Sequence, residues 1–331
     1  MNLLILSPGR RVEIVNYFKE TFHPVGRKVY TLDMSPYAPA LYAGDEYFCI
    51  PKDFNNLGSY IDHILAICKE KQITAILTLV DWELVLLSDY RERIEAQGIK
   101  LILSDIEFIK QTFDKYSFYC TYKDTIKLVE TVGSYEEAVS KIKDGCWNYP
   151  LFAKLRDGCA SIGIKKISCE NDFEGVKNNP LYIYQPFIEG DEYGIDAYFD
   201  MISGQLASVF IKRKIAMRAG ETDKAVSVKS DAVLKEIKKL SNIKGLYGPI
   251  DVDVFVSKEG EVYINEINPR FGGGHPHAHA CGVNFMQLIL NNLEGNTNNP
   301  EFNNYNEGKL MLKYNGLLFL DKKAETLMPP K

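Results

Sequence analysis

The sequence IDVDVFVSKEGEVYINEINPRFGGG, residues 250–274, has the clearest structural pattern in this chain. Apolar residues alternate with Asp251 and Asp253, and side chains two positions apart in a strand point to the same side. A Lys-Glu-Gly turn then separates this run from a second apolar run. The segment therefore predicts a β-hairpin with strands at 249–256 and 261–267.

The hairpin gathers oxygen ligands. Glu266 follows Asp253 by thirteen positions, enough for one strand, a turn and the return, so the two carboxylates are expected side by side. Two carboxylates and the amide oxygen of Asn268 on apolar strands need a compensating charge. Mg²⁺ prefers such ligands together with nucleotide phosphates, and Mn²⁺ is an alternative ion. The competing interpretation is a solvent-facing edge strand that ends in a simple Asn-Pro turn.

The segment NEINPRFGGG, together with the Asp thirteen residues before its Glu, resembles the metal-binding end of the ATP-grasp superfamily, in particular members related to the large subunit of carbamoyl-phosphate synthase. The resemblance implies an ATP-grasp fold of mixed α/β and α+β type. It places a Rossmann-like (pre-ATP-grasp) domain at 1–110, a small lid lobe at 111–190, and an antiparallel-sheet lobe with the Mg-ATP and substrate site at 191–331.

Residues 184–200, YQPFIEGDEYGIDAYFD, resemble the segment that binds adenine in this superfamily. The resemblance implies adenine contacts at Gln185, Phe187 and Ile188, and a ribose contact at Glu192. This chemistry is reasonable, because adenine needs a backbone donor and acceptor, and a carboxylate accepts from both ribose hydroxyls. The alternative is an ordinary strand and turn.

Residues 150–166, PLFAKLRDGCASIGIKK, resemble the phosphate-binding lysine and glycine loop of the superfamily. Lys154 follows an apolar strand, where an ammonium is costly unless it meets an anion. Glycines allow backbone N–H groups to approach phosphate oxygens closely. The implied ATP contacts are Lys154, Gly158, Ser161 and Gly163, with Lys115 as the lysine that opens the domain. A surface turn and a solvated helix lysine are the alternatives.

Three arginines are candidates for the phosphates and the substrate carboxylate. Arg213 and Arg218 belong to the basic stretch 211–222. The alternative interpretation is that this stretch is a solvated loop. Arg270 follows Asn268-Pro269, and its planar guanidinium suits a carboxylate or a developing oxyanion. Gly272, Gly273 and Gly274 would let backbone amides approach the same centre.

His275, His277 and His279 alternate directly after the glycines. A metal triad is disfavoured, because the acidic pair already accounts for a metal. Packing or a helix cap is the main expectation. Substrate contact or proton transfer from an amine is the alternative for His275 and His277.

Short apolar runs alternate with helical patterns in the first 110 residues, which predicts a parallel sheet covered on both faces. The expected strands are 2–6, 29–32, 75–80 and 101–103. Ligands of open α/β sheets bind at the carboxyl ends of such strands. Candidate substrate residues at these ends are Ser7, Gly9, Arg10, Asp33, Asp81 and Glu83.

Composition restricts the function. A net charge of −5 argues against broad nucleic-acid binding. The apolar run at the N-terminus is too short for a membrane span or a signal peptide, and the seven scattered cysteines indicate reduced thiols. We expect a cytoplasmic protein with small-molecule partners and no membrane, for which a homodimer is one compatible assembly.

Together these patterns predict a ligase that uses Mg-ATP to convert a carboxylate to an acyl phosphate and couples it to an amine, releasing ADP and phosphate. Alternatives are a carboxyphosphate-forming enzyme like carbamoyl-phosphate synthase and a nucleotide-binding module without turnover. A nicotinamide-dependent oxidoreductase is disfavoured, because the first turn, Ser-Pro-Gly-Arg-Arg, lacks G-x-G-x-x-G.

Overall fold

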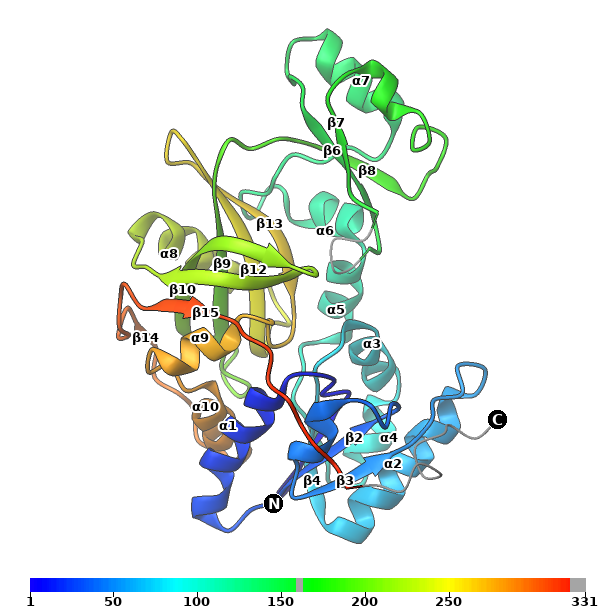
Figure 1. Ribbon diagram of the computed structural model, residues 1–331, viewed down its shortest axis with the longest axis vertical. Helices are drawn as coiled ribbons and strands as arrows, with labels where there is room; N and C mark the ends of the chain where they lie inside the picture. Colours follow the sequence, from blue (N-terminus) through cyan, green and yellow to red (C-terminus); the bar gives the residue numbers. More distant parts are fainter. Residues whose placement is uncertain (159–162, 322–331) are drawn as a thin grey trace. The chain divides into compact units, whose positions relative to one another are not determined.

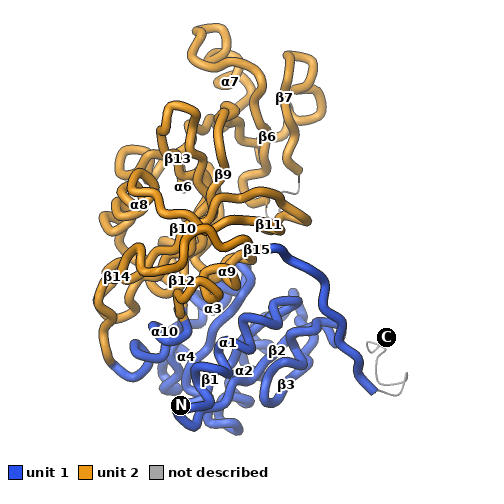
Figure 2. Tube along the Cα trace, turned by 60° about the vertical axis from the view of Figure 1, so that its left-hand side comes forward, with its two compact units in different colours: residues 1–102, 286–295, 312–331 blue, residues 103–285, 296–311 orange. Residues whose placement is uncertain are grey.

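The computed structural model describes residues 1–158 and 163–321. The chain forms two compact units (Figure 2). Unit 1 contains residues 1–102 with the later segments 286–295 and 312–331, and unit 2 contains 103–285 and 296–311. The sequence-based division assigned residues 191–331 to one lobe, whereas the segments 286–295 and 312–331 belong to unit 1.

Unit 1 is built on a five-stranded parallel sheet in the order β3-β2-β1-β4-β5. Every residue of β2 and nearly every residue of β1 is buried, as expected for strands covered on both faces. The strands are β1 Asn2–Leu6, β2 Val29–Asp33, β3 Glu46–Cys49, β4 Ile73–Thr78 and β5 Lys100–Leu101. The helices are α1 Val12–Phe22, α2 Leu57–Lys71, α3 Asp81–Asp89, α4 Arg91–Glu95 and α10 Phe285–Leu293, with 3₁₀ turns η1 His23–Val25 and η2 Pro39–Ala43.

The parallel sheet confirms the prediction for the first domain. The edge strand β3 was missed, because its four residues alternate between half-buried and exposed and lack an apolar run. The helical segment between β4 and β5 consists of two helices, α3 and α4, which meet at Tyr90.

Unit 2 contains a seven-stranded sheet and a three-stranded antiparallel sheet (Figure 1). The larger sheet has the order β13-β12-β9-β10-β11-β15, and β14 pairs with β10. Its strands are β9 Gly190–Phe199, β10 Leu206–Arg218, β11 Glu221–Ser227, β12 Gly248–Ser257, β13 Val262–Asn268, β14 Glu301–Phe302 and β15 Leu310–Leu312. The smaller sheet, β7-β6-β8, consists of β6 Leu151–Leu155, β7 Lys165–Ile167 and β8 Tyr182–Pro186.

Helices cover the apolar face of the larger sheet. Ile195 of β9, Ile211 of β10 and Val252 of β12 belong to one buried core that also includes residues of α5, α6 and α8. The helices of unit 2 are α5 Ile106–Phe113, α6 Lys115–Tyr122, α7 Tyr135–Lys143, α8 Asp231–Lys238 and α9 His275–Ala280, with 3₁₀ turns η3 Glu170–Phe173 and η4 Lys239–Asn242. Since strand side chains alternate, the opposite face is available to polar residues.

β10 has thirteen residues and continues into the basic stretch that begins at residue 211. Its polar end, Lys212 to Arg218, resembles a loop in sequence, but pairing with β11 keeps it extended, and β9 pairs with β10 as far as Arg213. Within the described part of the chain, no helix has the length and apolar character required to cross a bilayer.

Candidate active site

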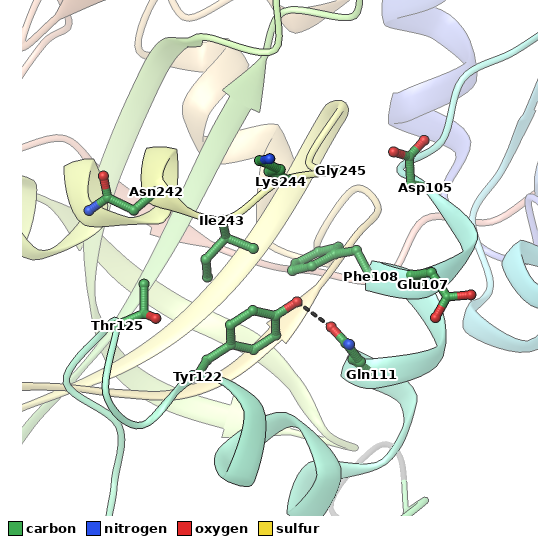
Figure 3. A pocket seen from close by; sticks show the side chains of 10 residues that line it. All are labelled: Asp105, Glu107, Phe108, Gln111, Tyr122, Thr125, Asn242, Ile243, Lys244 and Gly245. Carbon is green, nitrogen blue, oxygen red and sulfur yellow. Dashed lines mark hydrogen bonds between the residues drawn. The ribbon is translucent and has the colours of Figure 1, made fainter.

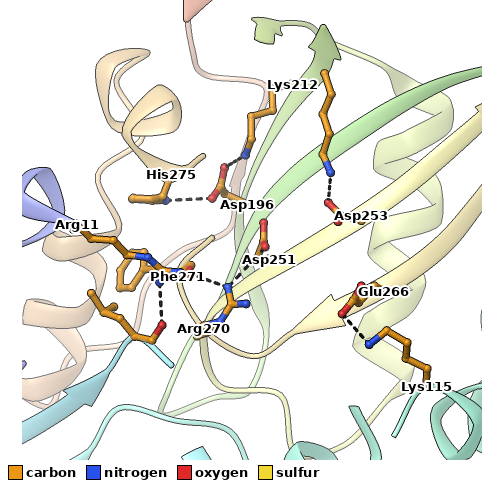
Figure 4. A network of polar contacts seen from close by, with 12 residues as sticks. Arg11, Lys115, Asp196, Lys212, Asp251, Asp253, Glu266, Arg270, Phe271 and His275 are labelled. Atoms are coloured by element: carbon orange, nitrogen blue, oxygen red, sulfur yellow. Dashed lines mark hydrogen bonds and ion pairs between the residues drawn. The ribbon is translucent and has the colours of Figure 1, made fainter. Parts of the chain in front are cut away.

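Polar side chains gather on the face of four neighbouring strands of the larger sheet that lies opposite the core with α5, α6 and α8. Asp251 lies opposite Asn268 on one side and Asp196 on the other, and Asp253 lies opposite Glu266 and Gly194. The carboxylates on this side come from β9, β12 and β13 (Figure 4), and we call Glu192, Asp196, Asp251, Asp253 and Glu266 the acidic face.

The predicted hairpin is confirmed, and Asp253 and Glu266 are direct cross-strand partners. The pairing register shifts between Asp253 and Val254, where Val254 faces Ile264. This bulge leaves Asn265 as an extra residue beside the carboxylates. The ligand roles of Asp253, Glu266 and Asn268 stay predictions.

Two lysines of β10 point to the acidic face. The Lys214 Nζ lies 2.7 Å from Glu192 Oε1 and 2.6 Å from Asp253 Oδ1, and only 5% of its side chain is exposed. Burial acts to lower the pKa of Lys214, but Asp253 and Glu192 raise it above its ordinary value. The Lys212 ammonium forms a buried ion pair with Asp196. Both lysines therefore contact carboxylates of the acidic face.

Arg213 and Arg218 are not brought to this face, which corrects the expectation for the basic stretch. Arg213 alternates with Lys212 and Lys214 along the strand and lies 3.7 Å from Asp191. Arg218 is 55% exposed and pairs with Asp223 at 2.9 Å. Strand alternation puts Lys212 and Lys214 on one face and Arg213 on the other, which can be read only once this stretch is known to be a strand. Arg218 lies beyond two register shifts in the pairing of β10 with β11.

Lys115 reaches the acidic face from the start of α6. Asp114 caps this helix by accepting from the N–H groups of Tyr116 and Ser117, and its carboxylate also binds Arg156 of the segment after β6. These contacts hold the Lys115 Nζ 3.4 Å from Glu266 Oε1. The same ammonium donates to the carbonyl of Gly158.

Lys154 of β6 also points to the acidic hairpin. Its Nζ donates to Asn265 Oδ1 at 3.0 Å. Burial lowers the pKa of Lys154, with Lys115 acting in the same direction and Glu266 opposing. A desolvated ammonium next to carboxylates is well suited to receive a further anion.

The glycine loop is described only in part. Gly158 and Gly163 flank it, and Gly163 has a φ of +76°, a conformation that favours glycine. Ser161 lies outside the described residues.

The predicted adenine segment follows β8. The Gln185 side chain is buried and donates to Thr131 Oγ1 at 2.9 Å, so it does not face a nucleotide. The Phe187 N–H donates to the carbonyl of Pro150 at 3.2 Å. The Gln185 side chain and the Phe187 N–H therefore make contacts within the lobe, whereas the Phe187 ring is 48% exposed.

Arg270 follows β13 and faces Asp251. Its Nη1 lies 3.8 Å from Asp251 Oδ2 and donates to the Phe271 carbonyl at 3.1 Å. Burial and the neighbouring Asp253 raise the pKa of Asp251 to about 7, with Lys212 and Arg270 opposing. A Cβ at Gly272 would lie 2.2 Å from Asp251 Oδ1, so only glycine allows the backbone to approach this carboxylate.

The histidines pack inside unit 2. His275 is fully buried, with Nδ1 3.2 Å from Asp196 Oδ1. His277 is buried against Phe210, with Nε2 2.8 Å from the Lys309 carbonyl. Among the described residues no group of His, Cys, Asp and Glu side chains forms a metal cage. The burial of His275 and His277 agrees with the packing expectation, and the substrate role considered for them stays a prediction.

The family matches agree with this geometry. Residues 113–274 match the family described as the ATP-grasp domain, and this range contains Lys115, Lys154 and the whole acidic hairpin. The chain contains an ATP-grasp domain. Residues 3–102, ahead of it, match the PylC-like N-terminal domain.

Known proteins with the same organisation are similar along most of the chain. The tyramine–L-glutamate ligase of Methanocaldococcus fervens is 26% identical over 247 residues, which cover 73% of this chain and 72% of that protein. The crystal structure of N5-carboxyaminoimidazole synthetase from Staphylococcus aureus matches with a TM-score of 0.70 at 17% identity, covering 93% of this chain and 80% of that one. A biotin carboxylase from Campylobacter jejuni gives a TM-score of 0.71 at 16% identity, covering 93% and 74%. These two structures share the fold of this chain, and the family match identifies that fold as ATP-grasp.

The PylC-like domain holds a second polar cluster. Glu83 is fully buried and accepts from Ser7 Oγ at 3.0 Å, Tyr60 OH at 2.9 Å and Thr78 Oγ1 at 2.5 Å. Lys52, which sequence reasoning missed, lies with its Nζ 2.6 Å from Glu83 Oε1 and is also buried. Of the other candidates in this domain, Asp33 accepts from the Gly9 N–H at 3.1 Å, Arg10 is exposed and Asp81 begins α3. Glu83 is thus part of a sealed network.

Unit 2 also has a hollow of about 350 Å³ away from the acidic face. Phe108, Tyr122 and Ile243 form its apolar wall (Figure 3), and Tyr122 donates to Gln111 at its rim. Phe108 and Ile243 belong to the core on the helix-covered side of the sheet. The hollow is therefore separate from the carboxylates and lysines described above.

Proposed function

We propose that this chain is an ATP-dependent ligase that phosphorylates the carboxylate of a small molecule and couples the acyl phosphate to an amine, releasing ADP and phosphate. The observation that carries the proposal is the cross-strand pair Asp253–Glu266 surrounded by Lys115, Lys154 and Lys214. The similarity to a ligase named for an amine and an amino acid supports the same reaction class.

The reaction must bring two anions together, because a carboxylate attacks the γ-phosphoryl group. Phosphoryl transfer depends mainly on positioning and on stabilising charge. Lys115, Lys154 and Lys214 come from three separate segments of the ATP-grasp domain and meet at one hairpin. Their ammonium groups would bind the triphosphate and offset its charge.

The acidic hairpin fits Mg²⁺, or Mn²⁺, only in the presence of nucleotide. Asp253 and Glu266 provide two carboxylates and Asn268 an amide oxygen, fewer ligands than a complete protein cage. Mg²⁺ is ordinarily held in this way, with phosphate oxygens completing its shell. When bound, the ion would draw charge from the phosphates. Lys214, which contacts Asp253, would then be released toward the phosphates.

Arg270 is the residue we assign to the substrate carboxylate. Its guanidinium lies at the end of the acidic hairpin, anchored by the Phe271 carbonyl and near Asp251. A planar fork of donors suits a carboxylate and then the tetrahedral oxyanion that forms when the amine attacks. The amine nitrogen forms the new C–N bond, phosphate leaves with the C–O bonding pair, and the nitrogen releases a proton.

The nucleotide base would bind after β8. Because the Phe187 N–H is already used and the Gln185 side chain faces inward, the carbonyl of Pro186 and the N–H of Ile188 are the backbone pair that we assign to adenine. A proline carbonyl remains a full acceptor. Glu192, at the edge of the acidic face, is assigned to the ribose hydroxyls.

The test is ADP release in the presence of a panel of carboxylic acids, with and without amines, and with hydroxylamine to trap an acyl phosphate. The proposal requires ADP release that depends on a carboxylate, a hydroxamate with hydroxylamine, and an amide product with an amine. Turnover that needs only bicarbonate would support the carboxyphosphate alternative. ATP binding without turnover across the panel would instead indicate a binding module.

A further inference from the structure

A buried cation in the PylC-like domain has no part in the reaction above. The Lys52 side chain is 1% exposed, and its ammonium contacts Glu83 at 2.6 Å and Ser7 Oγ at 2.7 Å. The same ammonium lies 4.6 Å from the centroid of the Trp82 ring and 5.1 Å from that of Tyr60. A desolvated cation over an aromatic face is attracted by its quadrupole.

The partners of Glu83 keep this cation in place. Tyr60 and Thr78 donate to the same carboxylate, so Lys52 is held from several elements of the domain. The Trp82 ring therefore rests on a rigid support. Rigid aromatic rings make good contact surfaces, because little side-chain freedom is lost when a ligand binds.

Phe54 extends the aromatic surface into solvent. Its ring centroid lies 5.6 Å from that of Trp82 with the planes tilted by 54°, and Phe54 is 62% exposed. Trp82 is itself partly exposed. A loop phenylalanine of this exposure leaves apolar surface in water, and tilted ring pairs at such distances can accept a third ring.

The position in the fold also favours a ligand. Trp82 lies in the first turn of α3, soon after β4, and Phe54 follows the carboxyl end of β3. Open α/β sheets bind their ligands outside the carboxyl ends of the strands. The aromatic pair thus occupies the binding edge of the sheet.

We propose that Phe54 and Trp82 form a binding site for the aryl group of a small molecule, with Lys52 as the residue that positions Trp82. That this molecule is a substrate of the ligase rests on the proposed function, whereas binding itself does not. Asp53 and Asp81 adjoin the two rings in sequence, so an aryl-bearing amine is the substrate that we favour.

Tryptophan fluorescence can test the site without ATP. The chain has two tryptophans, and Trp147 is buried in unit 2, where its Nε1 donates to Glu130 at 2.7 Å. In Trp147→Phe, Trp82 is therefore the sole reporter. Phenethylamine and phenylacetate are the aryl probes, and butylamine and butyrate are aliphatic controls.

We expect a saturable change in Trp82 fluorescence with phenethylamine, and binding about threefold to tenfold weaker in Phe54→Leu. Tyr149→Leu, which removes a partly exposed ring of unit 2, should leave binding unchanged. Saturation with phenylacetate alone would keep the aryl site but overturn the favoured amine. A linear, non-saturating response, or equal responses to aliphatic probes, would overturn the site.

If Trp147→Phe fails to fold, the native chain and its Phe54→Leu variant provide the same difference measurement. Because no nucleotide is present, loss of the aryl site leaves the proposed ligase reaction untouched. Conversely, saturable binding in a chain without carboxylate-dependent ADP release would retain the site and reject the ligase.

Discussion

The two units use the same residue types, lysine and carboxylate, in opposite ways. In the PylC-like domain, Lys52 and Glu83 are 1% and 0% exposed, and the hydroxyl groups of Ser7, Tyr60 and Thr78 donate to the Glu83 carboxylate. On the acidic face of the ATP-grasp domain, Asp253 is 24% and Glu266 28% exposed. The first cluster is closed to further ligands, whereas the Asp253–Glu266 part of the acidic face remains accessible, although the Lys212–Asp196 pair of that face is as buried as Lys52–Glu83.

This difference separates structural charges from reactive ones. A sealed ion pair with satisfied hydrogen bonds fixes the geometry around it, and removal of one partner leaves an uncompensated charge. An open cluster with several carboxylates facing lysines from different segments can exchange these internal pairs for an ion or a phosphate. Four substitutions test this contrast.

The largest effect is expected at the open cluster. Glu266→Gln removes one carboxylate of the cross-strand pair and should reduce carboxylate-dependent ADP release by about 10³-fold or more, because charge stabilisation dominates phosphoryl transfer. Glu261→Gln is the control, since Glu261 lies at the hairpin turn, is 57% exposed and pairs with Lys127. Magnesium-dependent turnover that survives in Glu266→Gln would contradict the assignment.

The sealed cluster should respond in stability. Glu83→Gln leaves the Lys52 charge buried without its counterion, and we expect a loss of about 3–5 kcal/mol in the free energy of unfolding. Denaturant titration measures the loss. The double variant Lys52→Met, Glu83→Gln should recover most of it, and a double variant as unstable as the single one would show that the ion pair is not the cause.

Adjacent residues of β10 provide a sharper comparison within the acidic face. Lys214→Met removes the ammonium that contacts Asp253 and should lower kcat by about 10²-fold, the usual scale for one charged donor in such a site. Arg213→Met, one position earlier and on the opposite face, should change kcat by less than about twofold. Equal losses in the two variants would mean that strand alternation does not select the functional cations.

The smallest effect concerns pH. Because the pKa of Asp251 is raised from 3.8 to about 7, the native chain keeps a proton that the unfolded chain releases, and this group's contribution to stability falls as pH rises from about 4 to 7. In Asp251→Asn this fall is absent. Between about pH 4 and 7, the free energy of unfolding of the variant should therefore rise relative to that of the native chain by about 1–2 kcal/mol, measured without nucleotide or metal. The difference is kept small because Asp251 is 17% exposed, and solvent weakens the coupling between its proton and folding. A constant difference would contradict the raised pKa.

Much of the fold and part of the site follow from local pattern. The hairpin, the parallel sheet and β6 were predictable because apolar periodicity and turn residues act over a few positions. The direction of Arg213 was not, because the polar residues at 212–218 become a strand only through pairing with β11, and with β9 as far as Arg213. The direction of Arg218 depends further on two register shifts between β10 and β11. The inward direction of Gln185 and His277 likewise depends on Thr131 and Lys309, which are distant in sequence.

The sequence by itself determined the hairpin, since alternation and a short turn bring the Asp253 strand back beside the Glu266 strand with the apolar residues on one face. Uninterrupted alternation would place Asn265 opposite Asp253, and the bulge between Asp253 and Val254 moves Glu266 into that position. Only the tertiary structure decided which cations join them. Lys115, Lys154 and Lys214 come from three segments, and Lys52 and Glu83 lie 31 positions apart. Such meetings depend on packing of whole elements, and no spacing within one strand or helix encodes them.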